Sequence, residues 1–215
     1  MLTLDDLSDI GRIVAIDAET TGIRTPTAAE VRKMPKGLRL PGIIIEIGCV
    51  ELTREGEGWK TGATWQKRIQ PNGPISKDSI AIHGIHPAEL KDAPTFKDVL
   101  DEFEDFIGQD VLLAHSARNE IGFLNFEYAR LGRCSFEESI FSESDFICTQ
   151  ELSRDFFPGV PGALDVLCDR LWIDRSDRFS HHGALLDAVL TAEAFMKMQG
   201  GFVVDETRSI SFDGP

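Results

Sequence analysis

The stretch Ile13-Val-Ala-Ile-Asp-Ala-Glu-Thr-Thr-Gly22 guides how the rest of the chain is interpreted. Its apolar run predicts a buried strand, and the run ends in two acidic residues, Asp17 and Glu19. Because side chains alternate along a strand, both carboxylates are expected to leave the same face. Two converging carboxylates repel each other unless a cation lies between them, and hard oxygen ligands suit Mg²⁺ or Mn²⁺. An edge strand with solvated acids is the competing interpretation.

The size and charge of the chain limit the classes of protein it can belong to. With 215 residues and 42% hydrophobic content, the chain can bury a full core and fits one domain, with a core of about 12–201 and a tail at 202–215 that has no clear pattern. The net charge of −14 disfavours a broad electrostatic grip on duplex nucleic acid. Any nucleic acid substrate is therefore expected to be held locally.

The N-terminal segment and the cysteines bear on the cellular compartment. Acidic residues stand where a signal peptide needs basic ones, and no apolar run approaches the length of a membrane span. The four cysteines are scattered without a Cys-x-x-Cys pair, which favours reduced thiols. We therefore expect a soluble, cytoplasmic protein that does not interact with membranes.

Hydrophobic patterns along the chain predict alternating strands and helices. Residues 43–52 and 61–69 are expected to pair across a turn at 54–60 and to form an antiparallel sheet with the Asp17 strand. Residues 24–41 read as a long loop or a short helix, and 82–87 as a turn-rich segment. Further short strands are predicted at 111–114 and 146–148, and helices at 95–106, 120–131, 163–171 and 183–198.

The segment His182-Gly-Ala-Leu-Leu-Asp187 is the second stretch that suggests chemistry. Five helical positions turn a side chain by about 140° net, so His182 and Asp187 cannot share a face if both are helical. They converge only if His182 lies on the loop before the helix, an arrangement that Gly183 permits. In the alternative interpretation, His182 begins the helix and Asp187 is solvated.

Five segments, in order, resemble the DEDDh 3′→5′ exonucleases and, within that family, the proofreading epsilon subunits of bacterial DNA polymerases. The resemblance runs from about residue 13 to residue 201. The segments that carry it are Asp17-Ala-Glu-Thr-Thr-Gly22, Ile82-His-Gly-Ile85, His115-Ser-Ala-Arg-Asn-Glu-Ile-Gly-Phe-Leu124, Gly162-Ala-Leu-Asp-Val-Leu167 and His182-Gly-Ala-Leu-Leu-Asp187.

The resemblance implies an α/β fold, a ribonuclease H-like mixed five-stranded sheet flanked by helices. It also implies a two-metal mechanism with two divalent cations, Mg²⁺ or Mn²⁺, that releases nucleoside 5′-monophosphates from a 3′ end. Asp17 would bridge both ions, Glu19 and Asp187 would bind the ion that activates water, and His182 would act as general base. Glu120 takes the place of the remaining metal-binding acid. Substrate-binding positions are Thr20, Thr21, Ile82, His83, Ser116 and Asn119.

Three positions depart from the family pattern. Glu120 stands where the family carries Asp, Asn119 stands where it carries an aromatic residue, and Ser116 stands where Asn is usual. One added methylene moves a carboxylate by roughly 1.5 Å, which a direct Mg²⁺ ligand tolerates poorly and a water-mediated one tolerates better. We expect retained activity with a preference for Mn²⁺. Loss of the aromatic residue removes a stacking surface for a terminal base.

The leading hypothesis is a metal-dependent 3′→5′ exonuclease that acts on single-stranded DNA. Two alternatives stay open: an RNA exonuclease of the same fold, and a catalytically impaired module that binds nucleic acid or a polymerase. A self-repelling acid cluster has no use in a pure binding module, which favours the enzyme. Association with a DNA polymerase is possible, although residues 200–209 lack the Gln-led clamp-binding motif that epsilon subunits carry.

Overall fold

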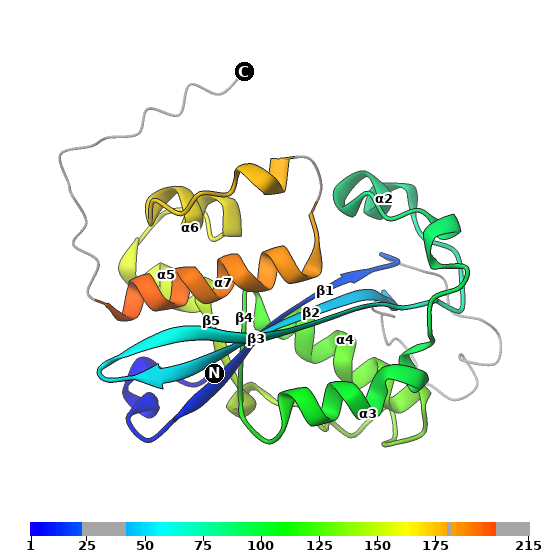
Figure 1. The fold of residues 1–215 in the computed structure, drawn as a ribbon, viewed down its shortest axis with the longest axis horizontal. Coiled ribbons are helices and arrows are strands. Elements are labelled where there is room, and N and C mark those ends of the chain that lie inside the picture. Colours follow the sequence, from blue (N-terminus) through cyan, green and yellow to red (C-terminus); the bar gives the residue numbers. More distant parts are fainter. Residues whose placement is uncertain (23–41, 180–181, 201–215) are drawn as a thin grey trace.

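The computed structural model describes residues 1–22, 42–179 and 182–200, and in this part of the chain a five-stranded sheet lies between two layers of helices (Figure 1). The strand order is β3-β2-β1-β4-β5. β1 pairs antiparallel with β2, and β2 pairs antiparallel with β3, whereas β1, β4 and β5 are parallel. The strands are β1 (Arg12–Thr20), β2 (Ile44–Glu55), β3 (Gly58–Arg68), β4 (Val111–Ala114) and β5 (Phe146–Cys148). The predicted mixed five-stranded α/β fold is confirmed.

Helices cover both faces of the sheet. Figure 1 shows α5, α6 and α7 on one side and α3 and α4 on the other. The helices are α2 (Lys77–His83), α3 (Phe96–Ile107), α4 (Ala117–Arg130), α5 (Thr149–Phe156), α6 (Leu164–Arg170) and α7 (Ala184–Gln199), with 3-10 turns η1 (Leu4–Leu7), η2 (Pro87–Leu90), η3 (Glu143–Asp145) and η4 (Ser176–Phe179). The predicted helices therefore exist, with ends shifted by up to three residues.

β1 feeds both hydrophobic cores because its side chains alternate. Ile13 and Ala15 pack in the core that contains residues of α5, α6 and α7. Val14 and Ile16 pack in the core that contains residues of α3 and α4. Asp17 continues the series of Ile13 and Ala15, so the alternation directs it toward the α7 side of the sheet.

A glycine lets α7 approach the sheet closely beside Asp17. Gly48 of β2 pairs with Asp17 of β1. A Cβ atom at Gly48 would lie 2.2 Å from the backbone nitrogen of Leu185, which no real side chain permits. Buried Glu46, two residues earlier, accepts a hydrogen bond from the backbone N–H of Ala184 at 3.0 Å. These contacts fix the first turn of α7, and with it Asp187, against the sheet.

Three local predictions were wrong or incomplete. Ile82 and His83 are the last residues of α2 and not part of a turn-rich segment, because Gly84 ends that helix in the left-handed conformation at φ 70°. The β2–β3 turn is tighter than predicted, since the strands reach Glu55 and resume at Gly58. Helix α5 was not predicted. The segments 24–41 and 202–215 lie outside the described residues.

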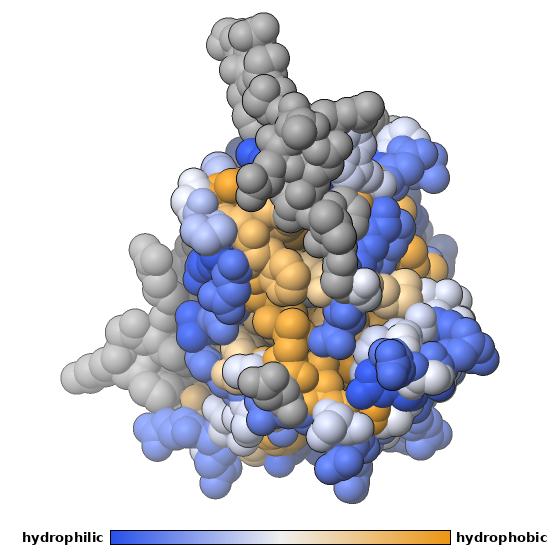
Figure 2. All heavy atoms as spheres, turned by 90° about the vertical axis from the view of Figure 1, so that its left-hand side faces the viewer, coloured by the Kyte–Doolittle hydropathy of each residue, from blue (hydrophilic) through white to orange (hydrophobic). Residues whose placement is uncertain are grey.

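The core on the α7 side of the sheet reaches toward the surface. Partly buried apolar residues that pack against it include Trp59, Phe156 and Met196. Figure 2 shows apolar side chains gathered in the middle of the face that is on the left in Figure 1, with polar ones around them. Among the described residues, no helix has both the length and the apolar character needed to cross a bilayer.

Candidate active site

A pocket of about 240 Å³ opens where the C-terminal ends of β1 and β4 meet the first turns of α4 and α7. Parallel strands end at the same sheet edge, so β1 and β4 deliver their following residues to one place. Every sequence-predicted site residue except Thr21 lines this pocket. The lining consists of Asp17, Ala18, Glu19, Thr20, Ser79, Ile82, His83, His115, Ser116, Asn119, Glu120, Phe123, His182 and Asp187.

Four carboxylates converge in this pocket. Asp17 and Glu19 come from β1, Glu120 from α4 and Asp187 from α7, and Glu120 and Asp187 are each only 4% exposed. Burial, then the charges of Glu120, Asp187 and Glu19, raises the pKa of Asp17 well above its usual value. Burial, then Glu19, likewise raises the pKa of Glu120. Burial, then Asp187 and Glu46, raises the pKa of Glu19 to about 7.

The acid cluster fits a divalent cation. Glu120 Oε2 is buried and has no hydrogen-bond partner among the described residues. Glu19, His182 and Asp187 offer ligand atoms that all lie within 4.8 Å of one another. Carboxylate oxygens this close together are suited to binding a hard cation. Such a cation would offset the repulsion that contributes to the raised pKa values of Asp17, Glu19 and Glu120. The residues present therefore fit the metal that the family pattern implies.

His182 lies on the loop before α7, and Asp187 lies one turn inside the helix. Gly183 caps the helix with extended backbone, the arrangement that the sequence analysis required for His182 and Asp187 to converge. His182 Nδ1 is 3.7 Å from Asp187 Oδ2. The backbone N–H of His182 donates to the carbonyl of Ile82 at 3.4 Å, which ties this loop to the end of α2. Burial, then the nearby Arg178, lowers the pKa of His182 and favours the neutral ring.

The turn between β4 and α4 places Glu120. Ser116 has left-handed backbone at φ 61° and ψ 46°, a conformation that Asn adopts more readily than Ser. α4 begins at Ala117, which puts Glu120 in its first turn with the carboxyl toward the pocket. Asn119 is exposed at the rim.

The predicted substrate-binding residues differ in their surroundings. Ile82 is 55% exposed at the mouth of the pocket. His83 is 4% exposed, and its Nδ1 accepts a hydrogen bond from the backbone N–H of Ile85 at 3.0 Å. Thr20 lines the pocket, whereas the hydroxyl of buried Thr21 accepts a hydrogen bond from the backbone N–H of Ile43 at 2.9 Å. Thr21 thus joins β1 to the start of β2 outside the pocket.

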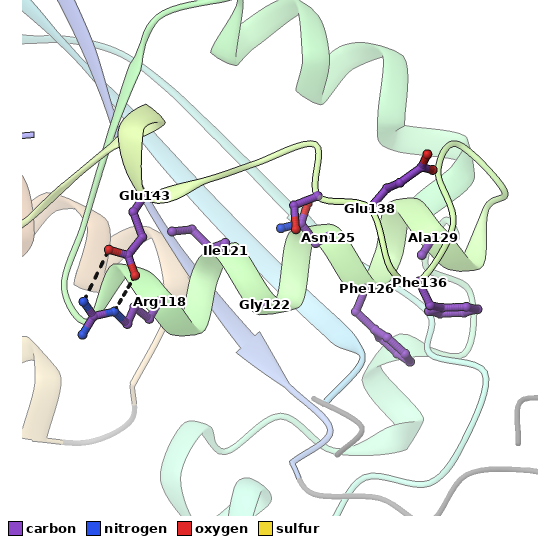
Figure 3. Close-up of a pocket in the computed structure, with 10 residues that line it drawn as sticks. Arg118, Ile121, Gly122, Asn125, Phe126, Ala129, Phe136, Glu138 and Glu143 are labelled. Carbon is purple, nitrogen blue, oxygen red and sulfur yellow. Dashed lines mark hydrogen bonds and ion pairs between the residues drawn. The ribbon is translucent and has the colours of Figure 1, made fainter. Parts of the chain in front are cut away.

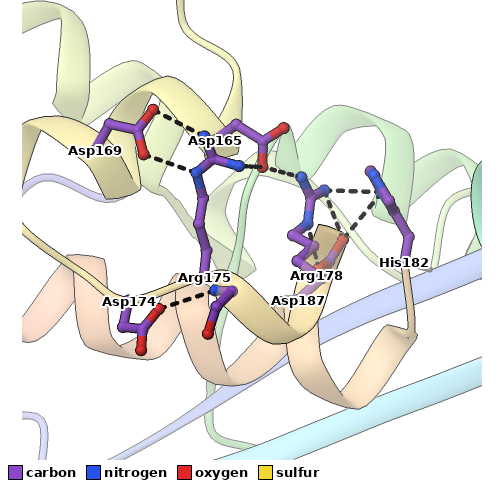
Figure 4. Close-up of polar contacts among 8 residues, drawn as sticks. Asp165, Asp169, Asp174, Arg175, Arg178, His182 and Asp187 are labelled. Atoms are coloured by element: carbon purple, nitrogen blue, oxygen red, sulfur yellow. Dashed lines mark hydrogen bonds and ion pairs between the residues drawn. The ribbon is translucent and has the colours of Figure 1, made fainter. Parts of the chain in front are cut away.

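Sequence reasoning missed Arg178, a basic residue in direct contact with the cluster. It belongs to η4, and its guanidinium makes a two-point contact with Asp187, with Nε 2.6 Å from Oδ1 and Nη2 2.8 Å from Oδ2 (Figure 4). One arginine in a polar segment has no distinctive spacing. Its position four residues before His182 was the available signal.

A second pocket, of about 490 Å³, lies along the outer face of α4 (Figure 3). Its walls come from α4 and the segment 136–143, and the Arg118–Glu143 ion pair, with N–O contacts of 2.8 and 3.4 Å, lies at one end. None of the four clustered carboxylates lines it. The acid cluster therefore lines the smaller pocket, although the larger one is more apolar.

Comparisons with known proteins agree with this geometry. A family model described as "Exonuclease" matches residues 14–195. The DNA polymerase III subunit epsilon of Pasteurella multocida is 37% identical over 191 residues, covering 88% of this chain and 69% of the relative. That of Escherichia coli K12 is 35% identical over 193 residues, covering 89% and 73%.

Solved structures show the same fold. The nuclease domain of 3′hExo, a DEDDh family member bound to rAMP, has a TM-score of 0.67 at 23% identity, covering 90% of this chain and 94% of that one. Exonuclease X in complex with 5′ overhanging duplex DNA has a TM-score of 0.59 at 24% identity, with the same coverage. Exonucleases of this kind bind nucleic acid and generally use divalent metal ions. The chain belongs to the exonuclease family and is a 3′→5′ exonuclease that hydrolyses phosphodiester bonds.

Proposed function

We propose that this exonuclease removes nucleoside 5′-monophosphates from the 3′ end of single-stranded DNA by a two-metal mechanism, with Mg²⁺ or Mn²⁺. The observation that carries the proposal is the convergence of four carboxylates, two of them 4% exposed, in one pocket with His182 at its edge. When bound, two divalent cations would activate a water molecule and stabilise charge on the leaving 3′ oxygen. The carboxylates of this chain would hold them.

Each acid has a distinct place in this proposal. Asp17, whose pKa is raised by burial and by all three other acids, would serve both ions. Glu19 and Asp187 would hold the ion beside His182, because their ligand atoms lie within 4.8 Å of one another. Glu120 would serve the second ion, and its unpartnered Oε2 is the atom available for that role.

His182 would take the proton of the attacking water. Its ring is one-third exposed, at 33%, so the side chain can reach both the pocket and solvent. A lowered pKa keeps the ring neutral near pH 7, the form that can act as a base. His182 would then release the proton to solvent after the phosphodiester bond breaks.

The shape and charge of the pocket favour the end of a single strand. A pocket of about 240 Å³ suits a terminal nucleotide rather than a duplex, and exposed Ile82 can pack against its base. The net charge of −14 opposes extensive contact with phosphates beyond the end. Asn119, where the family carries an aromatic residue, removes a stacking contact worth ~1–3 kcal/mol.

A 5′-labelled oligonucleotide tests the proposal. Single-stranded DNA is incubated with the protein and Mg²⁺ or Mn²⁺, beside Asp17→Ala as the control for contaminating nucleases. A ladder shortened from the 3′ end, with mononucleotide product and no ladder from Asp17→Ala, is expected. If RNA of the same sequence is cleaved preferentially, RNA replaces DNA as the proposed substrate. Activity that survives in chelator would overturn the metal mechanism.

The similarity to DNA polymerase III epsilon subunits also supports association with a polymerase. In that setting, the exonuclease would remove misincorporated nucleotides at the primer end. Mixing the chain with the polymerase subunit of its source organism and running size-exclusion chromatography tests this. Co-elution is expected, and independent elution at micromolar concentrations would favour a stand-alone nuclease.

A further inference from the structure

Arg178 contacts the same groups that the proposed metal site requires. Its Nε and Nη2 lie 2.6 and 2.8 Å from the two carboxylate oxygens of Asp187, and Nη2 also lies 2.9 Å from His182 Nδ1. Its Nη1 donates to Asp165 of α6. The side chain is only 10% exposed. Figure 4 shows the guanidinium enclosed between Asp165, Asp187 and His182.

These contacts compete with a metal ion for Asp187. A two-point contact occupies both carboxylate oxygens in the plane where a guanidinium binds best. Asp187 is also one of the three residues whose ligand atoms lie within 4.8 Å of one another. A divalent cation and a guanidinium on one carboxylate repel each other, so the two contacts weaken each other.

We propose that Arg178 is a positioning residue that serves as the protein's own counter-cation on Asp187 and yields that carboxylate when a divalent cation binds. The inference rests on the proposed metal site. Asp165 supplies the anchor, because it holds Nη1 on the side away from Asp187 and keeps the guanidinium beside the site after release. The internal cation thus preserves the position of Asp187 without metal and weakens metal affinity.

The contact also holds His182 in a state unsuited to catalysis. An arginine N–H can only donate, so the Nδ1 atom it contacts carries the lone pair, and the neutral ring bears its proton on Nε2. In that tautomer, Nε2 cannot take a proton from water. Once Arg178 is released, the ring can gain a proton at Nδ1 from solvent and lose the one on Nε2 to solvent, with Asp187 Oδ2 3.7 Å from Nδ1. One side chain therefore contacts both groups.

Manganese binding to the full chain tests the proposal without measuring activity. Arg178→Met is compared with wild type by calorimetric Mn²⁺ titration and by thermal melting in chelator. We expect Arg178→Met to bind Mn²⁺ about tenfold more tightly, since a charge-assisted two-point contact no longer competes. In chelator, the variant should melt at a lower temperature and gain more from added Mn²⁺ than wild type does.

Arg175→Met is the matched control. Arg175 lies three residues earlier and contacts Asp165 at 3.6 Å and Asp169 at 2.7 Å, and the contacts drawn in Figure 4 do not link it to Asp187. This variant should melt lower without changing Mn²⁺ affinity. Arg178→Lys keeps the charge, loses the two-point contact and should bind Mn²⁺ with intermediate affinity. If Arg178→Met fails to fold in chelator, Arg178→Lys is used for the comparison instead.

Two failures are distinguishable. If wild type binds Mn²⁺ and neither Arg178 variant binds it more tightly, Arg178 only orients Asp187 and the counter-cation proposal is wrong. An equal gain in Arg175→Met would also overturn it, because the effect would then be general electrostatics. If wild type binds no Mn²⁺, the metal site of the proposed function fails, and this inference fails with it.

Discussion

The two ends of β1 hold acidic residues in opposite ways. At the start of the strand, Arg12 donates to Glu51 at 2.5 Å, to Asp110 and to the carbonyl of Phe106 at 2.8 Å. At its end, Asp17 and Glu19 meet Glu120 and Asp187, and Arg178 pairs with only one of these four acids among the contacts described. Both acids of the first cluster contact an arginine, whereas the contacts described pair only one of the four acids of the second with one.

The difference shows how acid clusters divide between structure and function. The Arg12 group is 27% exposed and its carboxylates are 22% and 35% exposed, so water and arginine share their stabilisation. The four clustered carboxylates are mostly buried, and burial together with mutual repulsion raises the pKa of Asp17, Glu19 and Glu120. Such repulsion lowers the stability of the folded protein unless a bound cation offsets it. Stability and activity should therefore respond oppositely to substitutions at the two ends.

The largest expected effect comes from Asp17→Asn. Loss of the central acid should lower the rate of single-stranded DNA hydrolysis by about three orders of magnitude, since metal catalysis contributes several kcal/mol. In chelator, the same variant should melt higher than wild type, because the substitution removes the cost of burying an acid beside three others. Glu51→Gln is the matched change at the other end, and it should lower the melting temperature while activity is unchanged. Equal loss of activity in both variants would contradict the contrast.

A second effect concerns pH in the absence of metal. The folded protein holds a proton on Glu19 up to about pH 7, whereas the unfolded chain releases it near 4.5. This contribution to stability is therefore complete below about pH 4.5 and is lost as pH rises through 7, up to about 3 kcal/mol in all. Urea unfolding in chelator at several pH values measures it.

Glu19→Gln is the control for the pH dependence. The loss of stability between about pH 4.5 and 7 should be smaller in this variant than in wild type. Saturating Mn²⁺ should reverse the trend in wild type, because metal binding requires deprotonated carboxylates. A pH profile that is identical in Glu19→Gln would show that the acid cluster does not cause the dependence.

Glu120 provides the third test, because its longer side chain departs from the family pattern. Glu120→Gln should lower activity about 10- to 100-fold, as expected for a group that acts on the metal through water. Glu120→Asp should keep activity and move the preference from Mn²⁺ toward Mg²⁺, which demands stricter geometry. The ratio of rates with the two metals is the measurement. An unchanged ratio would show that side-chain length at this position does not select the metal.

The sequence predicted the sheet edge and the acids because both follow from short-range rules. Alternation along 13–19 directs Asp17 toward one side, and Gly183 separates His182 from the helix that bears Asp187. The structure brings these residues to one pocket, and their individual roles stay predictions. Thr21 lies outside the pocket because its hydroxyl pairs with the backbone of Ile43.

What the sequence did not reveal depends on short elements or on distant contacts. α2 and α5 have seven and eight residues, too few for a clear helical period. Ser76, whose hydroxyl caps α2, and Gly84, which ends it, were the signals available for that helix. The roles of Gly48 and Arg178 depend on which segments lie beside them in space. Gly48, for example, lies against Leu185 of α7, which is 137 positions later in the chain.

The smallest expected effect comes from Arg12→Met, at the structural end of β1. Its ion pairs are partly exposed, so their loss should cost about 1 kcal/mol of unfolding free energy, and added salt should shrink the difference. Activity should stay at the wild-type level, because none of Arg12, Glu51 and Asp110 lines the pocket. Urea unfolding at low and high salt measures this difference. A double-mutant cycle with Glu51→Gln separates the contribution of the Arg12–Glu51 ion pair from that of packing by the apolar part of the arginine side chain. If the variant lost activity without losing stability, the two ends of β1 would be coupled, and the division between a structural and a catalytic cluster would no longer hold.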